Sequence, residues 1–589
     1  MCGISGYAGN RNVTSVLLNS LKRMEYRGYD SAGIATVSNG SITVVKDSGR
    51  IGQIANNIGE KNAKGKIGIA HTRWATHGGV TRNNAHPHTS CNGEVALVHN
   101  GIIENYQELV SSMKSDGHKF ISQTDSEVIA HMLESSYQRL KDPIKALRAT
   151  LEQITGSYAL VVVFSDKPDL ILGARKDAPL IIGIGKGENF IASDILSFID
   201  HTDRVIFLDE LEMVAVTNDS IRLMDIDGTP IEREITQVAW EAADISKEEF
   251  AHHTLKEIHE QGRTLRTSLL QEESNVEEFV SELKGARSVY ITACGSSFHV
   301  GLILRHLLTK LCKIPAQVFV ASESDEYVDL IDEETVLIAL SQSGETADLL
   351  KAVKDAKGKG AKVLSLVNSI GSSLSRESNI NLYLNCGPEI GVAATKSFTS
   401  QLAIVYEIIF KIANLDDRMD TLREISGIVE EVFLREDEIK RIAHLISNSS
   451  DVYFIGRGSH YPIALEGALK LKELSYIHAE GMAAGELKHG TLALVDDGTP
   501  AIVINPKDET YNDTLSNAAE MRARGARIIG ISSIGNEIYD FWIRLPEVDP
   551  LLQPILEIIP LQLLAYYAAV ERQNNPDYPR NLAKSVTVK

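Results

Sequence analysis

The feature of this sequence that most constrains its fold is a repeat within its second half. Three pairs of short segments recur there: Ser288-Val-Tyr-Ile with Asp451-Val-Tyr-Phe, Thr335-Val-Leu-Ile with Thr499-Pro-Ala-Ile, and Gly360-Ala-Lys-Val-Leu with Gly525-Ala-Arg-Ile-Ile. The offsets are 163 (451 − 288), 164 (499 − 335) and 165 (525 − 360) residues. Unrelated sheets share such segments by chance, but three matches at nearly one spacing favour two copies of one domain.

The pattern inside each copy predicts the type of domain. Apolar stretches alternate with amphipathic helical patterns, and the strands expected in the first copy are Val289–Ala293, Val318–Val320, Val336–Leu340 and Val363–Val367. Strands that alternate with helices form parallel sheets covered on both faces. The fold class is therefore α/β, with doubly wound parallel-sheet domains at 285–425 and 440–577.

The first 240 residues follow a different pattern. Short apolar stretches bounded by turn residues predict strands at Ile67–His71, Val95–His99, Ala159–Phe164 and Leu170–Gly173. Helices are expected near Val13–Met24 and Ser126–Leu140. We predict a mixed α/β domain rich in antiparallel pairing at 1–240, a helical linker at 241–284 and a C-terminal tail at 578–589.

Composition limits the possible partners and the compartment. The chain has 59 basic and 79 acidic residues, a net charge of 59 − 79 = −20, which argues against nucleic-acid binding. The most apolar long stretch, 551–570, contains prolines, glutamines and a glutamate, so we expect a buried core segment and no membrane span. The five cysteines are scattered and the N-terminus lacks a signal-peptide pattern, which predicts a cytoplasmic protein.

Cys2 is the candidate nucleophile. Removal of Met1 would leave Cys2 with a free α-amine, whose ordinary pKa of about 7.7–8.0 lets it act as a base near neutral pH. That amine can take the proton that the thiol must lose, so no separate histidine is required. An ordinary buried cysteine that happens to come second is the alternative.

A phosphate site is expected where a strand meets a helix at residues 341–346. Ser341, Ser343 and Thr346 offer hydroxyl groups, Gly344 allows a close backbone approach, and the helix N-terminus favours an anion. A simple capping box is the alternative, but ligands of doubly wound sheets bind at this end of the strands. Ser297, after the neighbouring strand, can add another hydroxyl group.

Three charged residues of the second copy share one helix face. Glu466, Lys470 and Glu473 stand at positions i, i+4 and i+7 among small and apolar residues, which indicates an active-site wall. A solvated ladder of ion pairs is the alternative. In the tail, Lys584 is a candidate for a Schiff base with a ketose carbonyl.

Four histidines raise the question of a metal. His71, His77, His86 and His88 could be considered as zinc ligands, but their spacing gives no closed tetrahedral set. We expect pocket and core histidines there, and predict neither a metal nor another cofactor.

Motifs in the first domain resemble those of class II glutamine amidotransferases, which are N-terminal-nucleophile hydrolases with a four-layer αββα sandwich. The motifs are Cys2-Gly-Ile, Tyr26-Arg-Gly-Tyr-Asp, His71-Thr-Arg-Trp-Ala-Thr-His-Gly and His99-Asn-Gly. The resemblance implies Cys2 as nucleophile, Asn100 and Gly101 as the oxyanion hole, and Trp74 as a gate for ammonia. It further implies a glutamine pocket made of Arg73, Thr76, His77 and Asp125.

The duplicated domains are similar to sugar isomerase (SIS) domains, and with the tail Pro579-Arg-Asn-Leu-Ala-Lys-Ser-Val the whole chain resembles the glutamine–fructose-6-phosphate aminotransferase family. The resemblance implies that glutamine and fructose 6-phosphate give glucosamine 6-phosphate and glutamate, the first step of hexosamine synthesis. It implies a base, Glu473, a ring-opening residue, His489, supplied by the partner in a homodimer, and Lys584 on the open sugar. The remaining sugar-site residues that it implies are Ser297, Ser341, Gln342, Ser343, Thr346, Val392 and Ala583, with Glu466 and Lys470 in support.

Other functions remain as alternatives. Another amidotransferase, such as an asparagine synthetase or a phosphoribosyl transferase, would need a nucleotide- or phosphoribosyl-binding module, and the sequence has no Walker loop. A non-catalytic sugar-phosphate sensor would have no use for Cys2 or Lys584. A deaminase that runs the sugar reaction backwards would make the first domain superfluous.

Overall fold

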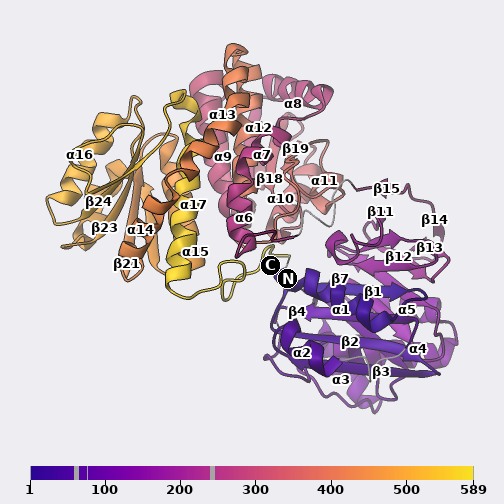
Figure 1. Cartoon of the computed structure of the whole chain (residues 1–589). Coiled ribbons are helices and arrows are strands. Elements are labelled where there is room, and N and C mark those ends of the chain that lie inside the picture. The colour runs from indigo at the N-terminus through magenta and orange to yellow at the C-terminus, as the bar shows by residue number, and fades with distance from the viewer. Residues whose placement is uncertain (1, 59–64, 76, 239–245, 588–589) are drawn as a thin grey trace. The chain divides into compact units, whose positions relative to one another are not determined.

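A computed structural model describes residues 2–58, 65–75, 77–238 and 246–587. The chain forms two compact units: Met1–Asp244 together with Ala583–Lys589, and Ile245–Leu582. Each unit can be followed by its colour in Figure 1, from indigo at the N-terminus to yellow at the C-terminus.

The described part of the first unit contains two antiparallel sheets. The eight-stranded sheet has the order β15-β11-β9-β10-β1-β4-β2-β3. Its strands are β1 (Gly3–Ala8), β2 (Ser31–Ser38), β3 (Ser41–Ser48), β4 (Ile67–Arg73), β9 (Ile181–Ile184), β10 (Asn189–Ala192), β11 (Arg204–Phe207) and β15 (Thr236–Gln237). The seven-stranded sheet has the order β14-β13-β12-β8-β7-β6-β5. Its strands are β5 (His88–Thr89), β6 (Val95–Ile103), β7 (Gly156–Phe164), β8 (Ile171–Lys176), β12 (Glu212–Val216), β13 (Ile221–Asp225) and β14 (Pro230–Ile231).

Helices cover the outer faces of these two sheets. Helices α1 (Val13–Arg23) and α2 (Ile51–Ile58) pack on the first sheet, and α4 (Glu127–Leu140) packs on the second with α3 (Tyr106–Ser115) and α5 (Pro143–Leu151) beside it. Apolar side chains from both sheets, including Ile69, Val98, Val161 and Ile191, form the core between them. This is the expected αββα order. Helices α1 and α4 were expected from the sequence, whereas α2, α3 and α5, which are shorter, were not.

The second unit begins with three helices and continues into two parallel sheets. The helices are α6 (His253–His259), α7 (Gln261–Ser268) and α8 (Glu273–Gly285). The first sheet comprises β16 (Ser288–Ala293), β17 (Ala316–Val320), β18 (Thr335–Ser341), β19 (Lys362–Val367) and β20 (Ile380–Tyr383). The second comprises β21 (Asp451–Gly456), β22 (His478–Ala483), β23 (Pro500–Ile504), β24 (Arg527–Ser532) and β25 (Phe541–Arg544).

The two parallel sheets have one topology, as the repeat predicts. Their strand orders are β17-β16-β18-β19-β20 and β22-β21-β23-β24-β25, so each strand of the first copy has a counterpart in the second. The helices that follow are α9 (Gly295–Leu307), α10 (Ala347–Gly358), α11 (Ser373–Glu377), α12 (Lys396–Ala413), α13 (Asp417–Phe433), α14 (Glu436–Ile446), α15 (His460–Ser475), α16 (Tyr511–Arg522) and α17 (Gln553–Glu571).

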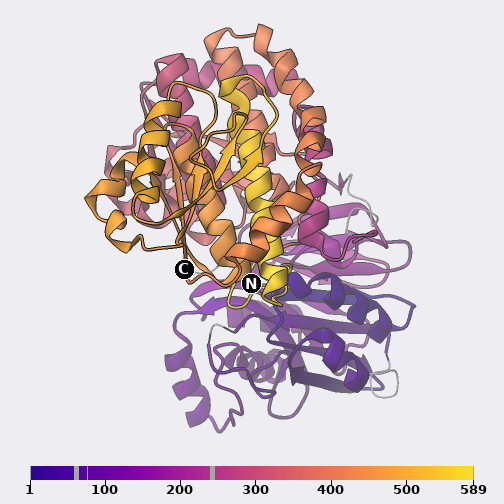
Figure 2. The ribbon, with the colours of Figure 1, turned by 60° about the vertical axis from the view of Figure 1, so that its left-hand side comes forward.

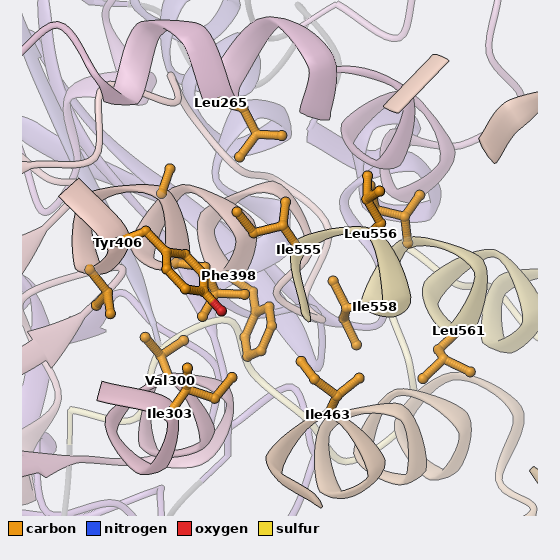
Figure 3. Close-up of a cluster of buried hydrophobic side chains, with 14 of the residues drawn as sticks. Leu265, Val300, Ile303, Phe398, Tyr406, Ile463, Ile555, Leu556, Ile558 and Leu561 are labelled. Carbon is orange, nitrogen blue, oxygen red and sulfur yellow. The ribbon is translucent and has the colours of Figure 1, made fainter. Parts of the chain in front are cut away.

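One continuous apolar core joins the two copies. Side chains from α7, α9, α12, α15 and α17 meet in it, and Figure 3 shows Phe398 and Tyr406 of α12 close to Ile463 of α15 and Ile555 of α17. In Figure 2 the yellow helix α17 runs through the middle of the unit. Among the described residues, only the segment Pro550–Glu571 is long and apolar enough to span a membrane, and 89% of its most apolar window is buried. This agrees with the expected core segment.

Candidate active site

Cys2 immediately precedes β1, an interior strand of the eight-stranded sheet in the first unit. Strand β1 lies between β10 and β4. The backbone N–H of Trp74, just beyond the end of β4, donates a hydrogen bond to Cys2 Sγ over 3.3 Å. Burial raises the pKa of the Cys2 thiol. A thiol with a raised pKa needs a base to take its proton before it can attack, which is the role expected of an α-amine freed by removal of Met1.

Asn100, on β6 of the other sheet, points its amide at residue 2. Its Nδ2 donates to the Cys2 carbonyl oxygen over 3.1 Å. Nε2 of His71 lies 3.0 Å from Asn100 Oδ1 and 3.1 Å from the carbonyl oxygen of His99. Burial lowers the pKa of His71 to about 3, so the ring is neutral. Since both neighbours of Nε2 are acceptors, Nε2 carries the hydrogen and fixes the orientation of the amide.

Gly101 follows on the same strand, in a conformation that needs glycine. Its φ is +125°, and a Cβ there would lie 2.1 Å from the carbonyl oxygen of Ser157 on β7. Any side chain would therefore push β6 and β7 apart. The backbone N–H of Gly101 therefore directly follows Asn100 along β6.

Arg73 is the charged centre of this site. Burial lowers the pKa of Arg73, whereas the charges of Cys2, Asp30 and Asp125 tend to raise it. These three groups therefore lie near the guanidinium. The guanidinium donates to the backbone carbonyl oxygens of His77, Gly78 and Gly79. It therefore also holds the loop that follows β4.

The other predicted glutamine residues lie around this loop. The Asp125 carboxylate accepts a hydrogen bond from the backbone of Ile103 over 2.8 Å, which attaches the segment before α4 to β6. The His77 ring lies edge-on to Tyr106, and Trp74 lies edge-on to Tyr29 with ring centroids 5.5 Å apart. Thr76 falls outside the described residues.

Three of the histidines considered as zinc ligands pack their rings against one another. His86 lies between His71 and His88, at centroid distances of 4.2 and 4.5 Å, and burial lowers the pKa of both His86 and His88. Buried neutral rings in mutual contact are typical of core packing beneath the strands that carry Cys2 and Asn100.

In the second unit, the predicted phosphate loops meet at a topological switch point. Strand β16 has β17 on one side and β18 on the other, so the connections leaving β16 and β18 diverge at their carboxyl ends. Such a divergence opens a crevice where doubly wound sheets bind ligands. Ser297, after β16, and residues 341–346, after β18, both lie at this point.

The loop after β18 is held in a fixed conformation. Ser341 Oγ accepts from the backbone N–H of Gly344 over 2.9 Å, and Ser343 Oγ accepts from that of Glu345 over 3.2 Å. Gly344 has a φ of +67°, and a Cβ there would lie 2.2 Å from Ser372 Oγ. Thr346 is the N-cap of α10 and makes no side-chain capping bond. This leaves its hydroxyl group available, together with the helix N-terminus, for an anion.

Ser297 is positioned by a residue that the sequence did not single out. Gln401 of α12 donates from Nε2 to Ser297 Oγ over 3.0 Å. Because Ser297 and Gln401 are far apart in sequence, no local pattern could reveal the pair.

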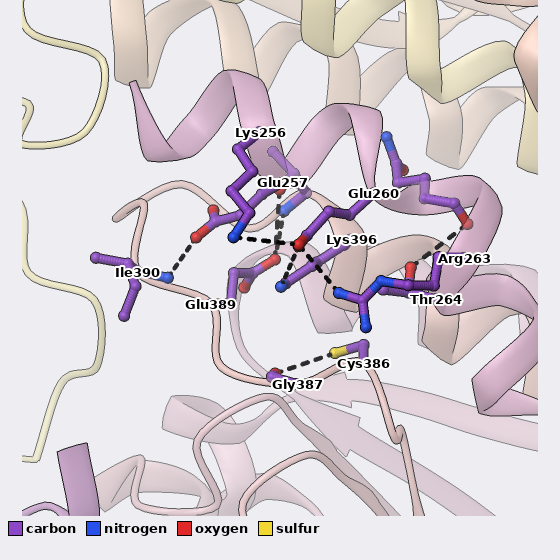
Figure 4. A network of polar contacts seen from close by, with 12 residues as sticks. Lys256, Glu257, Glu260, Arg263, Thr264, Cys386, Gly387, Glu389, Ile390 and Lys396 are labelled. Carbon is purple, nitrogen blue, oxygen red and sulfur yellow. Dashed lines mark hydrogen bonds and ion pairs between the residues drawn. The ribbon is translucent and has the colours of Figure 1, made fainter. Parts of the chain in front are cut away.

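A buried polar network fixes the loop that carries Val392 (Figure 4). The Glu257 carboxylate accepts from the backbone of Ile390 over 2.5 Å and of Gly391 over 3.1 Å. Lys396 Nζ lies 2.6 Å from Glu260 Oε2, also within the network. Val392 is buried and its backbone N–H donates to the Asp577 carbonyl oxygen over 3.2 Å, which ties the loop to the end of the unit.

Two of the three charged residues of α15 are buried and Glu473 is half-buried, which argues against a solvated ladder. Glu466 and Lys470 are 0% and 1% exposed. Lys470 Nζ lies 3.4 Å from Glu466 Oε1 and 2.6 Å from Glu473 Oε2. His299 of α9 contacts Glu466 with Nδ1 at 2.7 Å from Oε2, so the pair links the two copies. Burial opposes the charge on Lys470, but Glu466 and Glu473 outweigh it and raise its pKa.

The remaining predicted sugar residues are Gln342, His489, Ala583 and Lys584. Gln342 is half-buried in the serine loop, and His489 is exposed at the end of a short 3₁₀ helix, Ala484–His489. Ala583 and Lys584 fall in the first compact unit. His299, Gln401 and Glu257 are the polar residues that the sequence analysis missed.

Comparisons with known proteins match both halves of the chain. The SIS domain family matches residues 282–410 and 445–572, and the glutamine amidotransferase domain family matches 71–200. A glutamine–fructose-6-phosphate aminotransferase [isomerizing] of Methanothermobacter thermautotrophicus is 46% identical, with all of both chains covered. The chain belongs to the glutamine–fructose-6-phosphate aminotransferase family.

Two further members of the family agree with this assignment. The enzyme of the same name from Thermus thermophilus is 44% identical over the whole of both chains. The solved C-terminal domain of glucosamine-fructose-6-phosphate aminotransferase from Francisella tularensis is 33% identical, with a TM-score of 0.53. It matches 56% of this chain and 99% of its own length. The family therefore accounts for the N-terminal glutamine amidotransferase domain and for both SIS domains.

Proposed function

We propose that this chain transfers the amide nitrogen of glutamine to fructose 6-phosphate and isomerises the product to glucosamine 6-phosphate, with release of glutamate. The observation that carries the proposal is the pairing of two sites in one chain. One unit presents Cys2 beside an amide donor, and the other presents a hydroxyl-rich loop at the switch point of a parallel sheet.

The first half-reaction uses the Cys2 thiolate. It attacks the side-chain carbonyl of glutamine, while the α-amine takes the thiol proton. Asn100 Nδ2 and the Gly101 N–H stabilise the oxygen that becomes negative in the tetrahedral intermediate. Collapse releases ammonia and leaves a thioester, which water hydrolyses to glutamate. Arg73 and Asp125 hold the carboxylate and ammonium of the substrate, with Thr76 and His77 in the pocket wall.

The second half-reaction takes place on the sugar. Ser341, Gln342, Ser343 and Thr346 hold the phosphate, and Ser297, Val392 and Ala583 line the sugar. His489 of a neighbouring subunit assists ring opening, and Lys584 forms a Schiff base with the ketose carbonyl, which releases water. Ammonia then adds to this Schiff base and expels the Lys584 amine, which leaves an imine at C2. Glu473 moves a proton from C1 to C2 of that imine. Its position matters more than its strength, because the neighbouring imine activates that proton.

The buried ion pairs of α15 support this role for Glu473. Lys470 lies between Glu466 and Glu473, with Nζ 3.4 Å from one carboxylate and 2.6 Å from the other. Glu473 is the more accessible of the two, with a side chain that is 21% exposed against 0% for Glu466. A carboxylate that the substrate can reach can accept a proton, whereas Glu466 holds Lys470 and His299 in place.

Ammonia reaches the sugar by an internal route that Trp74 gates. A dry passage keeps ammonia unprotonated and prevents its loss to water. The enzyme acts as a cytoplasmic homodimer that shares the sugar site between subunits. Incubation with glutamine and fructose 6-phosphate, followed by identification of the amino sugar by mass spectrometry, tests the proposal. Glutamate release without an amino sugar would contradict it.

A further inference from the structure

A second cluster of reactive side chains lies in the first unit, outside the glutamine pocket. Cys91 belongs to the loop between β5 and β6, and His118 to the segment between α3 and α4. His131 and Glu134 stand one turn apart on α4. One ligand atom from each of the four residues lies within 4.8 Å of every other. None of these residues has a role in the proposed amidotransferase reaction.

The separations between these atoms match a tetrahedral zinc site. Cys91 Sγ lies 3.6 Å from His118 Nδ1 and 3.5 Å from His131 Nδ1. His118 Nδ1 lies 3.8 Å from Glu134 Oε2. Zinc bonds of about 2.3 Å to sulfur and about 2.0–2.1 Å to nitrogen, at tetrahedral angles, place sulfur and nitrogen ligands about 3.6 Å apart. Both sulfur–nitrogen separations therefore already match zinc binding, and the other pairs of ligand atoms lie within 4.8 Å.

Neighbouring residues orient two of the ligands. His118 Nε2 lies 2.9 Å from Ser135 Oγ, so this ring presents Nδ1 to the common point. Metal-bound histidines characteristically hold their second nitrogen in this way. Glu134 Oε1 accepts from the Asn92 backbone over 3.0 Å, which leaves Oε2 for a cation. His131 Nε2 lies 3.6 Å from Glu127 Oε1, which is an ion-pair separation and too long for a hydrogen bond.

Burial adds a physical reason for a cation. The side chains of His131 and Glu134 are 1% and 2% exposed, and that of His118 is 13% exposed. A carboxylate buried to this degree requires a compensating charge. Cys91 lies at the exposed side, where an ion can enter.

We propose that Cys91, His118, His131 and Glu134 bind one structural zinc ion. A thiolate, two imidazoles and a carboxylate form a donor set that zinc favours, and four protein ligands leave no open position for catalysis. The ion joins the loop before β6, the strand that carries Asn100, to helix α4, which begins two residues after Asp125. The inference does not depend on the proposed sugar reaction.

Metal analysis of the full-length chain tests the proposal. The chain is expressed with zinc in the medium and dialysed into metal-free buffer. We then expect inductively coupled plasma mass spectrometry to find about one zinc ion per chain. Cys91→Ser and Glu134→Gln should each lower that content several-fold. Cys312→Ser is the matched control, because this cysteine lies in the other unit and contacts Ile409. Zinc far below one per chain, or equal content in Cys91→Ser and the unaltered chain, would overturn the proposal.

Cobalt substitution gives a test that does not depend on a variant folding. The unaltered chain and Cys312→Ser, produced with cobalt, should both show the ligand-field bands of tetrahedral cobalt and a thiolate-to-cobalt charge-transfer band. Absence of the charge-transfer band from the unaltered chain would overturn the assignment of Cys91. Its presence in both proteins, together with its loss from Cys91→Ser, would support it.

Discussion

Nε2 of His71 lies 3.0 Å from Oδ1 of Asn100, and this contact sets the direction in which the Asn100 amide points. Because burial keeps the ring neutral, His71 acts on the site as a hydrogen-bond donor and not as a base. The nitrogen of the amide then faces residue 2, where the oxyanion would form. His71 is thus a positioning residue for the oxyanion hole.

Asn100→Ala should lower kcat for glutamine hydrolysis by about 10²–10³-fold, because one oxyanion donor is lost. KM for glutamine should change little, since the donor acts in the transition state. His71→Phe should lower kcat less, as the amide remains but loses its orientation. Steady-state glutaminase assays measure both effects. An unaltered kcat in Asn100→Ala would remove this residue from the oxyanion hole.

Cys2→Ala should abolish glutamine-dependent synthesis, since no thioester can form. Conversion of fructose 6-phosphate to glucose 6-phosphate should stay measurable, because Cys2 takes no part in the proposed sugar chemistry. Coupled assays of the two activities on one preparation test this. Loss of both activities with an unchanged circular dichroism spectrum would contradict the two-site account.

Glu473→Gln should still bind fructose 6-phosphate but form no glucosamine 6-phosphate, because an amide cannot accept the proton from C1. Calorimetry measures the binding and mass spectrometry the product. The matched control is Glu480→Gln, a half-buried glutamate on β22 that has no role in the proposed reaction. If Glu473→Gln turned over like the control, the proton would have to move through another group.

His460 predicts how the stability of the second unit depends on pH. Burial opposes its charge, but Glu557 and Asp508, at 2.8 and 2.9 Å, outweigh burial and raise the pKa of His460 to about 9. The raised pKa means that the protonated ring stabilises the fold. That contribution, roughly 3 kcal/mol at most, is complete below about pH 6.5 and disappears as the pH rises through about 9.

Thermal unfolding across this pH range should therefore show a falling Tm, and His460→Gln should flatten the dependence. His444→Gln is the control, since the pair of His444 with Glu571 is largely exposed and contributes little. Equal pH dependence in His460→Gln and the unaltered chain would contradict the assignment.

Much of this architecture could be predicted because its signals are local. The alternation of strands and helices, the repeat, and the serine loop after β18 can each be read from neighbouring residues. The contacts of His299 with Glu466 and of Gln401 with Ser297 could not, since each joins residues more than a hundred positions apart. The cluster around Cys91 escaped as well, because its members come from separate segments that only the packing of α4 against the loop before β6 brings together.

In the proposed reaction, nitrogen freed at Cys2 reaches the sugar without entering bulk water. Glutamine with a heavy-isotope amide nitrogen, fructose 6-phosphate and an excess of unlabelled ammonium provide the most direct test, with mass spectrometry of the amino sugar as the readout. We predict glucosamine 6-phosphate that carries the heavy nitrogen almost completely. Product with the isotope ratio of the mixed ammonia pool would contradict the account.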